Sequence, residues 1–422
     1  MPQYLSPGVY VEEVPSSIKA IAGVSTSTPG FIGIVPDKVH LVAKREPTAA
    51  DPATTKFVDF TVPTAAKTAV LITNWTQFTN AFGDVIGDAA VTATADASPA
   101  IDAGHRNLAH AVYGFFNNGG SRCFVSRVTG VTDMDDALKG FAAIDEIAIV
   151  AAPGILDDAV RDKLVGHCLA TGDRFAILDG PPHATDTTTL TRLSTETPAG
   201  GVMPKKTDLA AWYFPWLKVF DPGTKLQHPA DAGVIEVPPS GHVAGIYARV
   251  DNNRGVHKAP ANEPVIGALD VSQPLSKADQ DGLNPKGVNC IRILNSNIYV
   301  WGARTIGGDA NADLKYINVR RTLLFLRESI DEGTQWVVFE PNEQGLWQKI
   351  TRNLTAFLTN VWRSGALFGT TPAEAFYVKC DAETNPAELR ELGQVVTEIG
   401  VAIVRPAEFV IFRISQFTAP SK

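Results

Sequence analysis

The sequence predicts a mixed α/β (α+β) protein that is built from more than one domain. At 422 residues, the chain is longer than a single hydrophobic core usually serves. Its hydrophobic content of 45% and charged content of 19% are those of a globular protein that can bury large cores. Strand–helix–strand patterns occur in the middle of the chain, and short strands alternate with helices in its last third. We therefore expect an α/β domain and a second domain with a mixed sheet and helices.

The first expected elements are a short strand near the N-terminus and a buried strand after it. Residues 1–22 contain the run PGVYVEEVP, a β-rich stretch between two prolines, which do not fit inside a sheet ladder. The apolar run over residues 29–35 predicts a buried strand. Residues 36–69 are rich in Ala, Thr, Pro and charged residues. We interpret them as an excursion on the surface, with a strand only over residues 57–62.

The middle of the chain gives the clearest α/β pattern. Residues 107–128 predict a helix, a turn and a strand. The continuous apolar run over residues 147–151 is typical of a strand that is covered on both faces. A helix follows, with residues of its buried face at four-residue spacing from Leu156 to Cys168, and then a strand over residues 174–178. Such units favour parallel strands that are joined by a right-handed crossover.

Two polar segments and an aromatic run follow. Residues 181–208 predict a loop, and residues 272–287 are the strongest linker signal, which we take as the domain boundary. The run WYFPWL at residues 212–217 favours an aromatic core strand. A platform that stacks against carbohydrate or bases is the alternative.

Beyond the linker, strands and helices alternate. We expect helices near residues 313–331 and 346–363. We expect strands near residues 290–294, 298–301, 336–339, 376–380 and 394–403, and a terminal strand over residues 408–417.

Charge and targeting signals exclude several classes of protein. The net charge of −8 and pI near 5.5 argue against a nucleic-acid partner, because such binders carry a basic stripe. No basic segment precedes an apolar run at the N-terminus, and no stretch approaches 18 uninterrupted apolar residues. We therefore expect neither a signal peptide nor direct membrane insertion. The cysteines form no CxxC pair and predict reduced core thiols of a protein folded in the cytoplasm: Cys123, Cys168, Cys290 and Cys380.

The chemistry-bearing residues form no recognised site. No nucleotide-binding, zinc-protease or nucleophile-elbow motif occurs, and the nearest histidines, His105 and His110, are five apart, which does not suit one helix face. Asn118–Gly120 could cradle a phosphate, but a turn between helix and strand is favoured. Asp179 ends a predicted strand, the usual place for a catalytic carboxylate, yet it precedes Gly-Pro-Pro and is interpreted as a turn former. We expect no catalytic residue, cofactor or metal, and the rival is an α/β enzyme that uses residues 147–179.

Both chain ends carry short strands that need cover on two faces. Along residues 408–417, apolar side chains alternate between both faces, so an uncovered strand would be an aggregation hazard. Pro15 and Pro406 mark hinges, so either end could add a strand to a neighbouring subunit. Pairing within one chain is the alternative, and the residues favour neither. The candidate interface residues are Val9, Tyr10, Val11, Phe409, Val410, Ile411, Phe412 and Ile414.

Four strings resemble the sheath subunit of contractile phage tails and phage-tail-like injection particles. They are PGVYVEE (7–13), YINVRR (316–321), WVVFEPN (336–342) and PAEFV (406–410). The similarity covers both ends and most of residues 285–417, and is looser at residues 117–128, 147–181 and 240–267. The resemblance implies a structural protein with no active site.

The resemblance also implies an arrangement of domains and a set of partners. It implies an N-terminal arm strand (1–22), an outer α/β domain (23–275), a discontinuous inner core domain (276–405, with the N-terminal arm) and a C-terminal arm strand (406–422). Arms of adjacent subunits would pair with a neighbour's sheet. The helical homopolymer would surround an inner tube protein, contact baseplate and terminal cap proteins, and contract to drive the tube through a target envelope. Assembly would be cytoplasmic, within a phage tail or a particle that is released; a non-contractile tail or baseplate protein is a further alternative.

The helix near residues 346–363 carries an unusual charge for an acidic protein. It holds no Asp or Glu, and at about 100° per residue Lys349, Arg352 and Arg363 fall within roughly 60°. Most of its apolar residues fall on the opposite side. This basic stripe is a candidate dock for an acidic tube surface, and a solvated face is the alternative. A second basic set ranks lower because acidic residues follow it: Arg320, Arg321 and Arg327.

Overall fold

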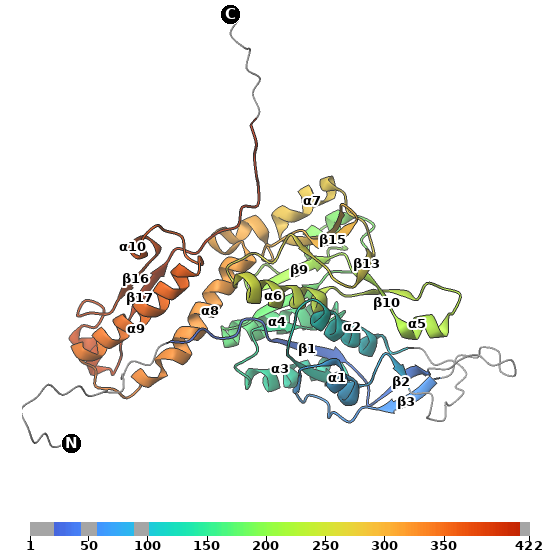
Figure 1. Cartoon of the computed structure of the whole chain (residues 1–422), viewed down its shortest axis with the longest axis horizontal. Helices are drawn as coiled ribbons and strands as arrows, with labels where there is room; N and C mark the ends of the chain where they lie inside the picture. Colours follow the sequence, from blue (N-terminus) through green and yellow to red (C-terminus); the bar gives the residue numbers. More distant parts are fainter. Residues whose placement is uncertain (1–20, 44–56, 88–100, 414–422) are drawn as a thin grey trace, which may run out of the picture. The chain divides into compact units, whose positions relative to one another are not determined.

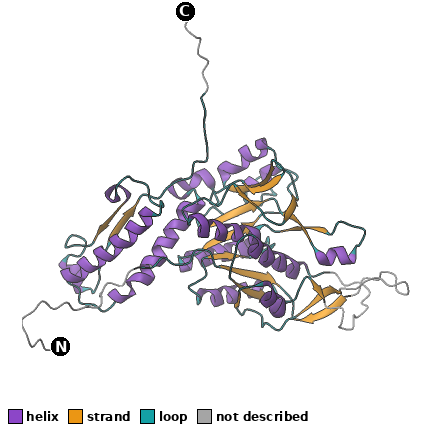
Figure 2. Ribbon diagram, in the orientation of Figure 1, coloured by secondary structure: helices purple, strands orange, loops and turns teal. Residues whose placement is uncertain are grey.

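The computed structural model describes residues 21–43, 57–87 and 101–413 (Figures 1 and 2). Helices and strands alternate along the chain, as the predicted α/β class requires. The chain divides into two compact units. The smaller unit contains Met1–Gly23 and Glu328–Ala402, and the larger unit contains Val24–Arg327 and Ile403–Lys422.

A nine-stranded sheet forms the centre of the larger unit. Its strand order is β12-β15-β14-β9-β8-β7-β1-β6-β4. The run from β14 to β6 is parallel, and β4, β15 and β12 add antiparallel strands at the two sides. The strands are β1 (Pro29–Ile34), β4 (Val70–Ile72), β6 (Cys123–Val128), β7 (Ile149–Ala151), β8 (Phe175–Asp179), β9 (Ala210–Phe214), β12 (Glu263–Pro264), β14 (Val288–Leu294) and β15 (Asn297–Val300).

The parallel strands are buried because their side chains are apolar on both faces. β7 and β8 pair in parallel, with Ile149 opposite Phe175, so the predicted strand–helix–strand unit is confirmed. The aromatic run forms β9, in which Trp212, Tyr213 and Phe214 are fully buried. It is a core strand, as predicted, and offers no stacking platform.

Apart from the short helix α5, the helices of the larger unit pack against this sheet through apolar faces. α2 and α6 approach each other closely, because a Cβ on Gly241 would lie 2.3 Å from the Ala111 backbone and one on Gly245 would lie 2.5 Å from the Phe115 carbonyl oxygen. Only glycine permits such an approach. The helices are α1 (Trp75–Phe82), α2 (Ala103–Asn117), α3 (Met134–Ala142), α4 (Asp158–Thr171), α5 (Pro222–Gln227), α6 (Ser240–Arg254) and α7 (Lys277–Leu283). Short 3₁₀ helices are η1 (Val131–Asp133), η2 (Thr187–Thr191), η3 (Asn284–Lys286) and η4 (Gly308–Leu314).

Two three-stranded sheets complete the larger unit. One has the order β11-β10-β13 and the other β3-β2-β5. Their strands are β2 (Lys38–Ala43), β3 (Phe57–Thr61), β5 (Ile86–Gly87), β10 (Leu217–Phe220), β11 (Val234–Val237) and β13 (Ala268–Val271).

The β2–β3 pair corrects part of the prediction for residues 36–69. The strand expected over residues 57–62 is confirmed as β3. The interpretation of the rest as a surface excursion is wrong for β2, which pairs antiparallel with β3 and fully buries Val39. The sequence KVHLVA is short and lies among polar residues, so its strand propensity alone did not predict β2. Its pairing with β3 identifies it as a strand.

The smaller unit combines a long helix with a two-stranded sheet. α8 (Ile317–Thr334) contains the division between the units, at residues 327 and 328. The elements that follow are η5 (Gln335–Val337), α9 (Gln344–Arg363), α10 (Pro372–Ala375), β16 (Phe376–Lys379), α11 (Ala387–Glu391) and β17 (Glu398–Val401). β16 and β17 pair antiparallel and form a sheet of their own.

Two expectations for the last third differ from the structure. The strand predicted over residues 336–339 is wrong, because this segment is the end of a 3₁₀ turn and a loop, in which Phe339 has a φ of 69°. The linker at residues 272–287 does not separate the compact units. β14 adds to β9 in the nine-stranded sheet, and this pairing keeps the following residues in the larger unit.

Candidate assembly surfaces

The C-terminal segment after Ile403 contains neither helix nor strand as far as the structure describes it, to Arg413. Figure 1 shows it leaving the larger unit as a single extended chain near α7. Four consecutive apolar side chains are 68% to 84% exposed: Phe409, Val410, Ile411 and Phe412. Within the part of the chain that the structure describes, these residues therefore have no strand partner. The other candidate interface residues lie outside the described part: Val9, Tyr10, Val11 and Ile414.

Glu408, directly before these apolar residues, is held by a cluster of donors that we name the Glu408 anchor. Its Oε1 accepts from Nε of Arg304 at 2.8 Å and from Nδ2 of Asn284 at 2.7 Å. Its Oε2 accepts from Nη2 of Arg304 at 2.8 Å and from the hydroxyl of Tyr316 at 2.9 Å. Burial alone would raise the pKa of Glu408, but these hydrogen bonds hold it below its usual value. Sequence analysis missed the anchor, and its one signal was a lone carboxylate at the start of an apolar run.

The sheet of the smaller unit has an edge that no described strand covers. β16 pairs with β17 from Phe376 opposite Val401 to Lys379 opposite Glu398. The N–H of Ala402 donates to the carbonyl of Ala375. Because hydrogen-bonded and non-hydrogen-bonded pairs alternate along antiparallel strands, the N–H and C=O of Val378 point away from β17. They lie on the uncovered edge of β16.

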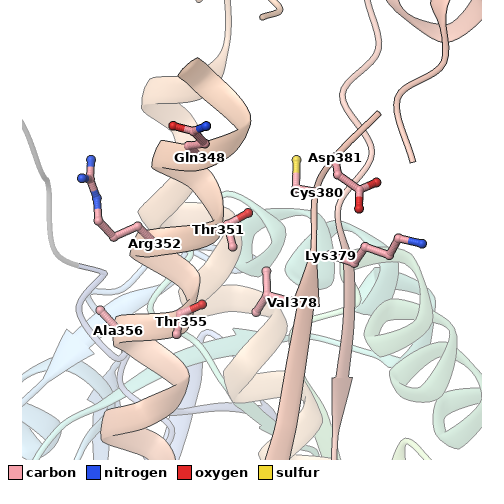
Figure 3. A pocket seen from close by; sticks show the side chains of 9 residues that line it. All are labelled: Gln348, Thr351, Arg352, Thr355, Ala356, Val378, Lys379, Cys380 and Asp381. Carbon is pink, nitrogen blue, oxygen red and sulfur yellow. The ribbon is translucent and has the colours of Figure 1, made fainter. Parts of the chain in front are cut away.

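An open groove of about 640 Å³ lies between α9 and β16 (Figure 3). In Figure 3, Val378 points toward α9, whereas Arg352 extends from α9 away from β16. No residue of β17 lines the groove. Its lining residues are Gln348, Thr351, Arg352, Thr355, Ala356, Val378, Lys379, Cys380 and Asp381.

α9 separates an apolar face from a basic one, as predicted. Its buried residues include Leu346, Ile350, Leu354, Phe357, Leu358 and Val361. Lys349, Arg352 and Arg363 are all exposed. Within the described ranges, none of these three cations forms an ion pair with a carboxylate. The basic stripe is therefore available to a partner surface.

Two members of the second basic set, Arg320 and Arg321, are engaged within the larger unit, whereas the third, Arg327, is exposed. Arg321 is 3% exposed and donates to Asp251 Oδ1 at 3.0 Å and Oδ2 at 2.6 Å. Its guanidinium also lies over the Tyr247 ring, 4.6 Å from the centroid. Arg320 pairs with Asp208 at 3.1 Å. These arginines stabilise the larger unit, because their charges are neutralised by partners that lie far away in the sequence.

Asp179 is a buried structural residue and its side chain does not start a turn, which corrects the prediction. Its Oδ1 accepts from the N–H of Ser240 at 2.8 Å, at the start of α6. Its Oδ2 accepts from the Ser240 hydroxyl at 2.8 Å and from the N–H of Gly154 at 3.0 Å. Burial raises the pKa of Asp179 to about 6, although these hydrogen bonds and Arg161 lower it. The carboxylate thus joins the end of β8 to α6 and to the loop after β7.

The other candidate chemical groups are also structural where the structure describes them. His110 pairs with Asp221 at 3.0 Å, and that carboxylate accepts from the N–H of Thr224 at the start of α5. Asn118 forms the predicted turn after α2, and its side chain bonds both backbone groups of Ile266. The four cysteines are free and buried. Across residues 21–43, 57–87 and 101–413, no cluster of three or more His, Cys, Asp or Glu is arranged to hold a metal ion.

No helix within the described ranges combines the length and the apolar character that crossing a membrane requires.

Comparison with known proteins identifies the family. Residues 128–306 match the model of the phage tail sheath protein central domain, and residues 309–417 match that of the phage tail sheath C-terminal domain. The tail sheath protein of Burkholderia phage BcepMu is 26% identical over 289 residues, which are 66% of this chain and 57% of that protein. This chain therefore spans less than two thirds of the length of that relative.

Two solved structures match nearly the whole chain. One is the sheath complex of an extracellular contractile injection system, PVC, in its contracted state, with 26% identity, a TM-score of 0.71 and 99% of both chains covered. The other is the helical sheath of the anti-feeding prophage in its contracted state, with 27% identity, a TM-score of 0.68, and 98% and 100% covered. Together the two family models span more than half of the sequence. The chain belongs to the phage tail sheath family, the family of structural sheath subunits found in phage tails and contractile injection systems.

Proposed function

We propose that this chain is the structural subunit of a contractile sheath, which polymerises helically around an inner tube and contracts to drive that tube through a target envelope. The observation that carries the proposal is the C-terminal arm: Phe409–Phe412 is apolar on both faces and exposed, and no described strand of the chain pairs with it. Exposed apolar strands of this kind are stable only when they join another sheet. In a polymer, the neighbouring subunit supplies that sheet.

The acceptor in our proposal is the uncovered edge of β16 in the next subunit. Val378 directs its backbone groups toward this edge, and this residue also lines the groove between α9 and β16. The short side chains of Thr351, Thr355 and Ala356 leave room there for an incoming strand. Backbone hydrogen bonds to β16 would supply affinity, and alternate apolar side chains of the arm would supply specificity. The N-terminal arm, Val9–Val11, would be exchanged in the same manner.

The exposed basic stripe of α9 would dock onto an acidic inner tube. Lys349, Arg352 and Arg363 lack ionic partners among the described residues and repeat in every subunit of a polymer. Exposed ion pairs contribute at most about 1 kcal/mol each. Individually weak contacts can set the register of tube and sheath in the extended state, and still break when the sheath contracts.

Contraction requires two packings of the same folded subunits. A head-to-tail, heterologous contact is the interface type that gives an open helical assembly. A gain of about 1–3 kcal/mol per subunit, the scale of common coupling energies, becomes large when many subunits repack together. We assign no catalytic step to this chain, because Asp179 is occupied by structural hydrogen bonds.

The remaining partners and the setting follow from this proposal. Baseplate and terminal cap proteins would contact the two ends of the sheath, and assembly would take place in the cytoplasm before any release of the particle. A solved structure that matches 99% of this chain is the baseplate of the anti-feeding prophage, which supports association with a baseplate.

Removing the arm tests the proposal. A variant lacking residues 409–422 keeps Glu408 and the folded units, and it should stay soluble and fold like the full chain. We expect electron micrographs to show long sheaths for the full chain and none for the shortened variant. Full-length sheaths from the shortened variant would exclude exchange of the C-terminal arm. Rings or fixed tubes from the full chain would instead favour a non-contractile tail protein, and small oligomers would favour the enzyme alternative.

A further inference from the structure

The exposed apolar arm begins at a partly buried carboxylate whose two oxygens are both hydrogen-bonded. The Glu408 side chain is only 19% exposed, whereas Phe409, the next residue, is 72% exposed. Four donor atoms from three residues converge on its two oxygens. Charge-assisted, bidentate bonds of this kind are about twice as strong as neutral ones and fix the direction of the bonded group.

The anchor connects to the nine-stranded sheet without a flexible link. Arg304 is 3% exposed, and its backbone N–H donates to the Asn289 side chain at 2.8 Å. The Asn289 side chain donates in turn to the carbonyl of Arg304 at 2.8 Å and to that of Trp212 at 3.2 Å. Asn289 lies in β14 and Trp212 in β9, so Glu408 is joined through Arg304 to two adjacent central strands.

A neighbouring ion pair, Arg405 with Asp313, is far more exposed than the Glu408 anchor. Arg405 pairs with Asp313 at 2.8 Å, three residues before Glu408, but these side chains are 59% and 89% exposed. Such a pair contributes little in water. The chain after Ile403 is thus loosely held at Arg405 and firmly held at Glu408, and its side chains are exposed again from Phe409 to Phe412.

We propose that Glu408 is a positioning residue that fixes the exit point and direction of the C-terminal arm, so that Phe409–Phe412 is presented outward to a neighbour and does not fold back onto its own subunit. This inference rests on the proposed exchange of the arm. It adds that the arm starts from a fixed point, the Glu408 anchor, and that tension along an exchanged strand is transmitted to the subunit through Glu408. Because the anchor orders the start of the arm before assembly, less conformational entropy is lost when subunits associate.

Weakening the anchor should make assembly less favourable without unfolding the subunit. In Glu408→Gln, the charge is lost, and an NH2 group, which donates, replaces one of the two oxygens that accepted hydrogen bonds. Arg304 keeps its contact with Asp309 at 3.1 Å. We expect the critical concentration for sheath formation, measured by sedimentation of the purified full chain, to rise on the order of tenfold. Tyr316→Phe removes a single donor and should raise it by a smaller factor. The control Arg405→Gln, which breaks only the exposed pair, should leave it within about twofold.

A second measurement separates positioning from folding. Cys380 lines the groove and is first replaced by Ser; the other native cysteines are fully buried, so spin labels can then be placed selectively on Ile411→Cys and Leu269→Cys, two exposed sites of the larger unit. Below the critical concentration, we expect a broader distance distribution in the Glu408→Gln background than in the parent or in Arg405→Gln.

The outcomes distinguish this inference from the proposed function. Long sheaths from the variant lacking residues 409–422 would overturn arm exchange itself. Loss of sheaths in that variant, together with unchanged critical concentration and distance width in Glu408→Gln and Tyr316→Phe, would overturn the anchor alone. If Glu408→Gln unfolds, Tyr316→Phe decides the matter by the same two measurements.

Discussion

The two units of this protein differ in how completely other elements of the chain cover their sheets. In the larger unit, nine strands are covered by helices, and buried charges such as Arg321 have partners within the same unit. In the smaller unit, the described strands form a sheet of two, β16 and β17, and a groove lies between β16 and α9. A two-stranded sheet is marginally stable by itself. The comparison indicates that the sheet of the larger unit is covered within its own unit, whereas the sheet of the smaller unit has an edge that no described strand covers.

The largest expected effect is on the free energy of unfolding, and it comes from Asp179, a buried carboxyl group of the larger unit. Its pKa of about 6 exceeds the ordinary value of 3.8, so the folded state binds more protons than the unfolded state between these values. The free energy of unfolding should therefore fall as pH rises from about 4 to 6, by about 3 kcal/mol for this group. This stabilisation is complete below pH 4 and is lost above pH 6.

Urea unfolding of the dilute full chain from pH 4 to 7 measures this effect, with Asp179→Asn as the comparison. The amide cannot titrate, so the variant should lack this part of the pH dependence. Identical pH profiles for both proteins would show that the carboxyl group does not change its protonation over this range.

An intermediate effect is expected at the uncovered edge of the smaller unit. Val378→Pro removes an N–H that points away from β17, so the β16–β17 hydrogen bonds remain while an added strand loses a donor. We expect the folded subunit to persist, with at most about 1–3 kcal/mol lost, and sheaths to be absent from micrographs. Val378→Ala keeps the donor and should still assemble. Normal sheaths from the proline variant would place the acceptor elsewhere.

The smallest effect on stability is expected on α9. Reversing the basic stripe, with Lys349, Arg352 and Arg363 all changed to Glu, should alter the free energy of unfolding by at most about 1 kcal/mol, because these side chains are exposed. Micrographs of assembled particles should nevertheless show empty, contracted sheaths, since attraction to an acidic tube becomes repulsion.

Salt and a matched variant complete this test. Wild-type adhesion between sheath and tube should weaken at high salt. Lys277→Glu, at an exposed position of α7, should leave particles intact. Extended, tube-filled particles with the triple variant would identify the stripe as a solvated face.

The sequence predicted those features that depend on local periodicity. Continuous apolar runs predicted β1, β7 and β8, and the 3.6-residue pattern predicted α9 with its basic face. The two-faced apolar character of residues 408–417 predicted that this segment needs a partner, and its described part is exposed in the single chain. Each of these conclusions uses only neighbours within a few positions.

The features that the sequence did not predict depend on contacts between residues that are far apart along the chain. Arg321 resembles a surface cation in the sequence, but Asp251, 70 residues away, draws it into the core. Nothing near Glu408 indicates Arg304, which lies 104 positions earlier. The pairing of β14 with β9 likewise moved the division of the chain from the predicted linker into α8.

The sequence by itself thus determined the family resemblance, the class of fold and the need of the arm for a partner strand. Only the tertiary structure decided which charges are buried, where the units divide and from which residue the arm departs. The physical reason is that strand and helix patterns repeat along the chain and can be recognised locally. Ion pairs and strand pairing instead depend on which distant segments meet, and a single Glu or Arg gives no periodic signal of its partner.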